Sequence, residues 1–310
     1  MPDRSVKLGI PGVDQAAARA ADAAEPAVAV IRPAVQSAPL VVASPHSGAR
    51  YDPEFVAASQ LDPLSLRRSE DAFVDEIFAA APDLGAPLLK ALFPRAYCDP
   101  NREPYELDQE MFEDPLPAHV NTASLRVAGG LGTIARLVAS GAEIYHGKLR
   151  FADAERRIER LYRPYHAALR QLVDETRRRF GCALLIDCHS MPSVGGPLDC
   201  DRGRPRPDMI LGDRHGASCK VELADAAESE LRSLGYRVAR NEPYAGGFTT
   251  QHYGRPAAGV HALQIEVNRA LYMDEKRIER RPGMARLTAD MAGLLAALGR
   301  LDSAAFRPAC

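Results

Sequence analysis

The run CALLIDC at residues 182–188 is the stretch of sequence that most directly indicates the fold. Asp187 is its one polar residue, and such a nearly continuous apolar run is typical of a central strand covered on both faces. Residues 153–180, before the run, carry apolar side chains at three- and four-residue steps, and a second helix is predicted after it at residues 217–235. A strand between two helices indicates an α/β fold.

The same alternation extends along the rest of the chain. Further strands are predicted at residues 39–44, 86–93, 236–240 and 260–267, and further helices at 65–81 and 282–299, with Pro164 as a candidate kink in the helix at 153–180. Strands that alternate with helices predict a single-domain three-layer α/β sandwich around a mixed, mostly parallel sheet.

The first part of the chain lacks this periodicity. Residues 1–37 are rich in Ala and Pro, and we expect them to form a loosely ordered arm with one short helix at residues 14–24. The main folded domain is then expected to span residues 38–310.

Composition excludes several classes of protein. The 310 residues contain 39 Lys and Arg against 41 Asp and Glu, a net charge of -2, whereas nucleic-acid-binding proteins are usually strongly basic. Because the sequence has no apolar stretch of about 18 residues and no secretory signal pattern, we expect no membrane partner and a cytoplasmic location. The six cysteines form no CxxC pair, which argues against a structural zinc site made of cysteines. The sequence predicts no oligomeric state.

Polar residues with potential chemistry follow the predicted strands. PHSG at residues 45–48 follows the first strand, and DCHS at residues 187–190 follows the central one. Ligands gather at the carboxyl ends of strands in such sheets, so His46 and His189 could converge on one metal ion. A hydrogen-bonded structural role for either histidine stays open at this point.

A carboxylate would complete a catalytic metal site of the two-histidine type. Glu70 and Asp71 lie early in the helix predicted at residues 65–81, where favourable charge near a helix N-terminus is the alternative explanation. Asp187 could orient the His189 imidazole or cap the turn after the strand.

Two further features have both a functional and a structural interpretation. Arg95 and Arg102 lie in the polar segment 94–105, where they could recognise a carboxylate or simply pair with Asp99 and Glu103. Glu266 lies within an apolar strand, so it either faces solvent at an edge or is buried and must be paired or functional. Next to a zinc-bound water it would be a natural general base.

Eight motifs occur in an order that resembles one family over residues 40–280. They are SPHSG (44–48), SEDAFVDEIF (69–78), PRAYCDPNREP (94–104), RPYHAAL (163–169), LLIDCHSMPS (184–193), RPDMILGDRHGASC (206–219), NEPYAGGFTTQHYGRP (241–256) and VHALQIEVNRALYMDE (260–275). The ordered set resembles the N-formylglutamate amidohydrolase (N-formylglutamate deformylase) family, whose fold is related to that of the zinc carboxypeptidases and aspartoacylase.

The resemblance implies a metal site. His46 and His189 would be ligands of a divalent cation, with Zn²⁺ as the first choice. Ala49 stands where the carboxypeptidases have their glutamate ligand, so Asp71 is expected as the third ligand, with Glu70 as its alternative.

The resemblance also implies roles for residues around the metal. Asn101 and Arg102 would grip the free carboxylate of the substrate, and Arg95 would polarise the scissile carbonyl. Glu266 corresponds to the general-base glutamate. Gly247 and Thr249, in the turn at residues 246–249, would line the substrate pocket.

The implied activity is hydrolysis of an N-acyl amide by a metal-dependent amidohydrolase. The substrate would be a small N-acyl amino acid such as N-formyl-L-glutamate, an intermediate of histidine degradation, and the products formate and the free amino acid. The alternatives are a zinc N-acyl amino acid hydrolase or carboxypeptidase-like enzyme with another substrate, and a binding relative without catalysis.

Overall fold

The computed structural model describes residues 25–197, 199–302 and 306, and its centre is a seven-stranded sheet in the order β1-β3-β2-β4-β7-β5-β6. The strands are β1 (Val28–Ile31), β2 (Leu40–Ser44), β3 (Leu88–Ala91), β4 (Ala183–Met191), β5 (Met209–Gly212), β6 (Val238–Arg240) and β7 (Val260–Asn268). β1 pairs antiparallel with β3, and β5 pairs antiparallel with β7, while the other neighbours are parallel. The sheet is therefore mixed and mostly parallel, as predicted.

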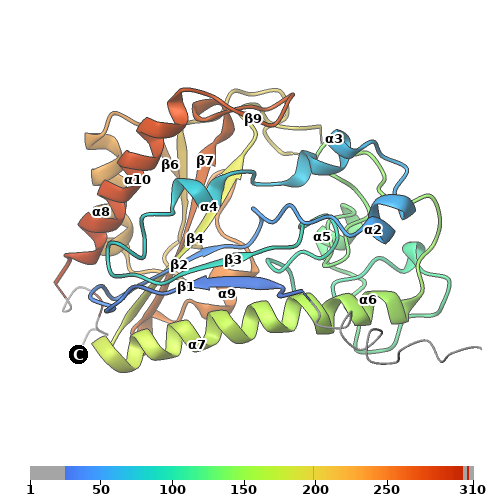
Figure 1. The fold of residues 1–310 in the computed structure, drawn as a ribbon, viewed down its shortest axis with the longest axis horizontal. Helices are drawn as coiled ribbons and strands as arrows, with labels where there is room; N and C mark the ends of the chain where they lie inside the picture. The colour runs from blue at the N-terminus through green and yellow to red at the C-terminus, as the bar shows by residue number, and fades with distance from the viewer. Residues whose placement is uncertain (1–24, 198, 303–305, 307–310) are drawn as a thin grey trace, which may run out of the picture.

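Helices cover both faces of this sheet (Figure 1). The helices are α2 (Pro53–Ala58), α3 (Pro63–Leu66), η1 (Arg67–Ser69), α4 (Val74–Ile77), η2 (Gln109–Met111), α5 (Leu125–Ala128), α6 (Phe151–Arg157), η3 (Ile158–Tyr162), α7 (Arg163–Phe180), α8 (Val221–Ser233), α9 (Phe248–Tyr253), η4 (Pro256–Ala258), η5 (Arg269–Leu271) and α10 (Gly283–Gly299), and β8 (Met273–Asp274) pairs with β9 (Glu279–Arg280). One buried core lies between the sheet and α4, α8 and α10, and a second lies between the sheet and α7. This arrangement confirms the three-layer α/β sandwich.

The central strand β4 contributes side chains to both of these cores. All nine of its residues are buried, and successive side chains point to opposite faces. Leu184 and Ile186 therefore join the core under α8 and α10, whereas Ala183 and Leu185 join the core under α7. Each buried leucine or isoleucine contributes on the order of 1.5–3 kcal/mol relative to exposure, which explains why an apolar run marks the middle of the sheet.

The helix predicted at residues 65–81 is wrong as one continuous element. Its apolar spacing is helical, but the chain leaves the helix after η1, Glu70 is extended, and Phe73 is left-handed with a φ of 66°. The Asp71 N–H donates to the His46 carbonyl oxygen at 3.1 Å. These tertiary contacts outweigh a local helical preference, which is a weak determinant by comparison.

The long helix predicted at residues 153–180 is confirmed in extent, and its backbone irregularity is a π-helical turn that ends two residues before Pro164. α6 and α7 are joined through the π-helical turn η3, in which the Arg163 N–H donates to the Ile158 carbonyl oxygen. Pro164 has no N–H to donate, and it follows this turn as the second residue of α7.

A loosely ordered arm is expected at residues 1–37, but part of that range forms a strand. β1 lies inside that range and pairs with β3 at the edge of the sheet, so the ordered chain begins before residue 38. The short helix expected at residues 14–24 lies outside the described residues. Within the described part of the chain, no helix combines the length and the apolar character that crossing a bilayer requires.

Candidate metal and active site

Three buried side chains from separate segments meet at the carboxyl end of the central strands. Asp71 Oδ2 lies 3.3 Å from His46 Nδ1 and 3.0 Å from His189 Nδ1. One ligand atom of each residue lies within 4.8 Å of the others. Two imidazoles and a carboxylate at this spacing could hold a metal ion in a site with an open position.

The topology of the sheet produces this convergence. β2 and β4 are parallel neighbours, so their carboxyl ends lie at the same edge. His46 follows β2 by two residues, and His189 lies within the last three residues of β4. The hydrogen bond from Asp71 N–H to the His46 carbonyl oxygen brings the third side chain to the same point.

Glu70, the alternative third carboxylate, points elsewhere. It accepts hydrogen bonds from Tyr51 Oη at 2.7 Å and from Arg67 Nε and Nη2 at 2.9 Å each. The geometry therefore brings Asp71, and not Glu70, to the two histidines.

The outward nitrogens of both imidazoles face carboxylates. His46 Nε2 lies 2.7 Å from Asp99 Oδ1, and His189 Nε2 lies 3.1 Å from Asp187 Oδ2. Asp187 is fully buried, and its oxygens have no well-aligned hydrogen bond among the described residues, so a proton on His189 Nε2 would stabilise it at the expense of the contact between this nitrogen and the Asn101 Nδ2 donor at 3.1 Å. Without a cation, each Nδ1 can donate to Asp71; with a cation bound, protons confined to the two Nε2 atoms would direct the Nδ1 lone pairs inward, the arrangement that metal-binding histidines use.

The two carboxylates that contact His46 are ionised. Burial by itself raises the pKa of Asp71, but the hydrogen bonds and positive charge of His189 and His46 outweigh it and hold that pKa well below its usual range. Burial likewise opposes ionisation of Asp99, yet Arg95, His46 and Arg102 keep its pKa well below the ordinary value. Asp71 thus presents a negative oxygen ligand to a cation at neutral pH, and Asp99 a negative partner to the outward nitrogen of His46.

Glu266 lies beside this cluster on β7, opposite His189 in the parallel register. It is buried in an interior strand and accepts a hydrogen bond from Gln264 Nε2 at 2.8 Å. Burial raises the pKa of Glu266 to about 7, with His189 lowering it and Asp71 raising it further. A carboxylate in this state exchanges a proton readily near neutral pH, which suits a general base.

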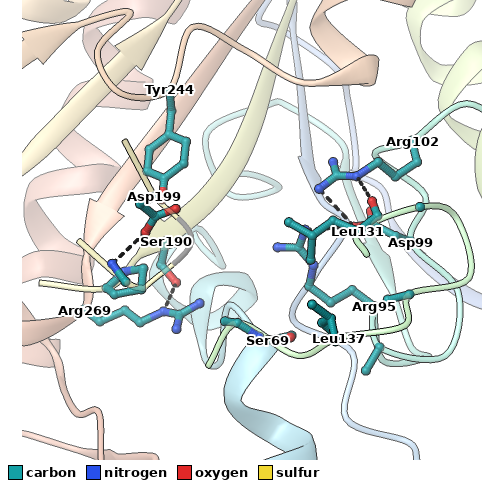
Figure 2. Close-up of a pocket in the computed structure, with 16 residues that line it drawn as sticks. Ser69, Arg95, Asp99, Arg102, Leu131, Leu137, Ser190, Asp199, Tyr244 and Arg269 are labelled. Atoms are coloured by element: carbon teal, nitrogen blue, oxygen red, sulfur yellow. Dashed lines mark hydrogen bonds and ion pairs between the residues drawn. The ribbon is translucent and has the colours of Figure 1, made fainter. Parts of the chain in front are cut away.

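A cavity of about 180 Å³ opens next to the cluster. Figure 2 shows Arg95 and Arg102 on one side, and Ser190, Tyr244 and Arg269 on the other. The cavity is small, and three of its lining residues carry guanidinium groups, so it suits a compact anionic molecule.

Arg95 and Arg102, in the polar segment at residues 94–105, both face Asp99, and both side chains are mostly buried rather than solvated. Arg95 Nη2 lies 2.8 Å from Asp99 Oδ2, and Arg102 Nη2 lies 3.7 Å from the same oxygen. Glu103 instead accepts from Asn121 Nδ2. Burial lowers the pKa of Arg102 to about 10, so its guanidinium remains charged at neutral pH.

Comparisons with known proteins show which family this chain resembles. Residues 38–273 match the model of the family described as N-formylglutamate amidohydrolase. The N-formylglutamate deformylase of Pseudomonas putida is 30% identical over 245 residues, which cover 76% of this chain and 82% of that protein. The crystal structure of an N-formylglutamate amidohydrolase from Ralstonia eutropha is 40% identical, with a TM-score of 0.80 over 87% of this chain and 95% of that one. A gene product of Agrobacterium tumefaciens, 20% identical with a TM-score of 0.62 over 88% of this chain and 94% of that one, shares the fold.

The chain belongs to the N-formylglutamate amidohydrolase family. This membership confirms the resemblance that the ordered motifs carry. The matched span contains every residue of the candidate site described above.

Gly247 and Thr249, expected to line the substrate pocket, contact Asn101 and Gln264 through their backbone N–H groups; like Asn101, they are not among the residues around the cavity of about 180 Å³. The Thr249 N–H donates to Asn101 Oδ1 at 2.8 Å, and the Gly247 N–H donates to Gln264 Oε1 at 2.8 Å. A Cβ on Gly247 would lie 2.4 Å from Asn101 Nδ2, so only glycine permits this close approach. The turn therefore fixes the Asn101 amide, whose Nδ2 lies 3.1 Å from His189 Nε2.

Sequence reasoning missed three residues of this family member's site. Asp99 was considered only as a partner of arginines, yet it also contacts His46. Arg269 donates from Nη2 to Asp71 Oδ1 at 3.0 Å and from Nε to Ser190 Oγ at 3.1 Å. Tyr244 lines the cavity. Of these three residues, Arg269 alone has a local signal in the sequence, because it is a charged residue directly after a buried strand and a charge at that point needs a partner.

Proposed function

We propose that this protein is a metal-dependent amidohydrolase that cleaves the N-formyl amide of an acidic amino acid. N-formyl-L-glutamate is the proposed substrate, and formate and L-glutamate are the products. The observation that carries the proposal is the buried group His46, Asp71 and His189 beside a cavity lined by arginines. The names of the relatives, N-formylglutamate deformylase and N-formylglutamate amidohydrolase, support the same reaction.

His46, Asp71 and His189 would hold the metal, which we propose to be Zn²⁺ or another divalent ion. Two imidazole nitrogens and one carboxylate oxygen are the ligand set of many catalytic zinc sites. Such an ion, when bound, supplies Lewis-acid chemistry, because it lowers the pKa of water and polarises a carbonyl group.

Glu266 is the proposed general base. It accepts a proton from the attacking water as the water oxygen bonds to the formyl carbon, and it returns this proton to the amine nitrogen as the C–N bond breaks. Arg95 donates to the carbonyl oxygen as negative charge develops there, an interaction worth about 3 kcal/mol per donor in comparable sites.

Asn101 and Arg102 are the proposed binding residues for the free carboxylate of the substrate. Arg102 Nε donates to the Leu131 carbonyl oxygen and Nη1 to the Asn101 carbonyl oxygen, both at 2.8 Å. These contacts fix the guanidinium plane while Nη2 faces no acid closer than 3.7 Å. A fixed guanidinium orients a carboxylate and so places the formyl carbon against Glu266.

A hydrolysis panel tests the substrate assignment. N-formyl-L-glutamate, N-acetyl-L-glutamate, N-succinyl-L-glutamate and N-formyl-L-leucine would be compared by kcat/KM with the metal-loaded protein. We expect N-formyl-L-glutamate to exceed each other compound by at least about tenfold, because a changed acyl group or a lost charge in a fitted pocket should cost about 1.4 kcal/mol or more. Faster hydrolysis of the acetyl or succinyl compound would replace the proposed substrate with another N-acyl amino acid.

Paired substitutions test the third ligand. We expect Asp71→Asn to weaken Zn²⁺ binding by at least about 100-fold, since even the partners of ligands commonly contribute 10- to 100-fold. Glu70→Gln is the matched control, because Glu70 contacts Tyr51 and Arg67 and not the histidines. Competition titration with a chromophoric chelator measures both. Weakened binding in Glu70→Gln with intact binding in Asp71→Asn would reverse the assignment.

A further inference from the structure

The helix that precedes the central strand holds the loop of Asn101 and Arg102 through backbone carbonyls. Tyr162 Oη donates to the Arg102 carbonyl oxygen at 2.8 Å. His166 Nε2 lies 2.8 Å from the Pro100 carbonyl oxygen. Further back, Arg157 Nη1 reaches the Tyr97 carbonyl oxygen at 3.4 Å. Three polar side chains of one helix therefore contact one loop.

The hydrogen bonds of His166 define its tautomer. A carbonyl oxygen only accepts, so Nε2 carries the proton, and Nδ1 can then accept from Tyr253 Oη at 2.9 Å. Burial lowers the pKa of His166 to about 4, so the ring is neutral at neutral pH. A neutral imidazole bound at both nitrogens and packed against Tyr162, with 4.3 Å between the ring centroids and 38° between the ring planes, is a rigid support.

The π-helical turn η3 sets the spacing of these contacts. Arg157 ends α6 and Tyr162, five residues later, is the last residue of η3, whereas Tyr162 and His166 in α7 are four residues apart. In an uninterrupted α-helix, neighbours on one face are three or four residues apart. The extra residue of the π turn thus lets Arg157, Tyr162 and His166 all reach the loop, and such turns are frequent at functional sites.

We propose that Tyr162 and His166 are positioning residues, which fix Asn101 and Arg102 so that they receive the free carboxylate of the substrate. This inference rests on the proposed function. The two carbonyls that they hold flank Asn101 directly, since Pro100 precedes it and Arg102 carries the second carbonyl. Neither side chain reaches the cavity lining, so both act through the loop. Recognition of a carboxylate by a guanidinium depends on orientation, and a displacement of about 1 Å can cost up to 100-fold in rate.

Four variants test the inference. Tyr162→Phe and His166→Phe each remove one donor, His166→Gln retains an N–H that can reach the Pro100 carbonyl, and Tyr236→Phe is the control. Tyr236 Oη donates to Asp290, away from this loop, so its loss matches Tyr162→Phe chemically. The measurement is kcat/KM for N-formyl-L-glutamate and for its analogue with a carboxamide in place of the α-carboxylate.

We expect Tyr162→Phe and His166→Phe to reduce the preference for the carboxylate over the carboxamide by about tenfold, mainly through KM, with bound metal unchanged. His166→Gln and Tyr236→Phe should keep the wild-type preference. A merely structural role would lower the rates for both compounds equally and leave their ratio intact. An unchanged ratio in both Phe variants would overturn the inference.

Hydrogen exchange of the peptide that contains residues 100–102 separates this inference from the proposed function. We expect faster exchange in Tyr162→Phe than in the wild type, whatever the substrate. If the wild type hydrolyses no N-formyl amino acid, the proposed function fails, and unchanged exchange would overturn the support of the loop as well. If the wild type is active and prefers the carboxylate, an unchanged ratio in both Phe variants overturns the positioning role and leaves the proposed function standing.

Discussion

Replacing Glu266 by Gln is expected to reduce kcat for N-formyl-L-glutamate by about 10³-fold, within the 10²- to 10⁴-fold range that a general base contributes. The amide keeps the size of the side chain and can still accept from Gln264 Nε2, the hydrogen bond that Glu266 Oε1 makes at 2.8 Å. It cannot accept a proton from water. KM and bound metal should change little, because Glu266 is not one of the three clustered side chains.

Steady-state kinetics with metal-loaded protein measure this effect. Glu76→Gln is a matched control, because Glu76 pairs with Arg280 at the surface, and it should leave kcat unchanged. A Glu266→Gln variant with kcat within about threefold of the wild type would remove Glu266 from the mechanism. A loss of metal along with activity would indicate a structural defect instead, and the metal content of the same sample reveals it.

Removing the metal is expected to have an effect at least as large. Chelation should abolish hydrolysis, and one equivalent of Zn²⁺ should restore it, because Lewis-acid activation and the ordering of the site are lost together. His189→Ala should show the same loss of more than about 10³-fold and should not recover with Zn²⁺. His146→Ala is the control, since His146 is exposed and lies outside the cluster.

Thermal unfolding gives a second readout that does not depend on activity. A ligand that binds only the folded protein stabilises it by about 2.7 kcal/mol at 100 times its Kd. Zn²⁺ should therefore raise the Tm of the wild type and of Glu266→Gln, but not that of His189→Ala. Full activity after exhaustive chelation, or an equal Tm shift in His189→Ala, would contradict the proposed metal site.

The sequence predicts those site residues whose positions follow from the strands of the sheet. Apolar runs identify β2 and β4 because both faces of these strands are buried, and parallel neighbours bring residues at their carboxyl ends together. His46 and His189 could therefore be paired without coordinates. Glu266 was found for a related reason, because a charged residue within an apolar strand needs an explanation.

The parts that the sequence did not predict depend on long-range contacts. The apolar spacing at residues 65–81 indicates a helix, but the contacts of Glu70 and Asp71 with distant residues interrupt it. The link from Asp99 to His46 joins residues 53 positions apart, and no local pattern indicates it. β1 is short and has an exposed edge, so its sequence shows too little alternation to be recognised as a strand.

The family membership and the geometry together make the metal site the central claim. Anomalous X-ray diffraction from crystals grown with Zn²⁺, recorded on both sides of the zinc absorption edge, tests it most directly. We expect one strong peak about 2.0–2.2 Å from His46 Nδ1, His189 Nδ1 and a carboxylate oxygen of Asp71. A fully loaded, active crystal whose peak lies away from these three atoms would contradict it.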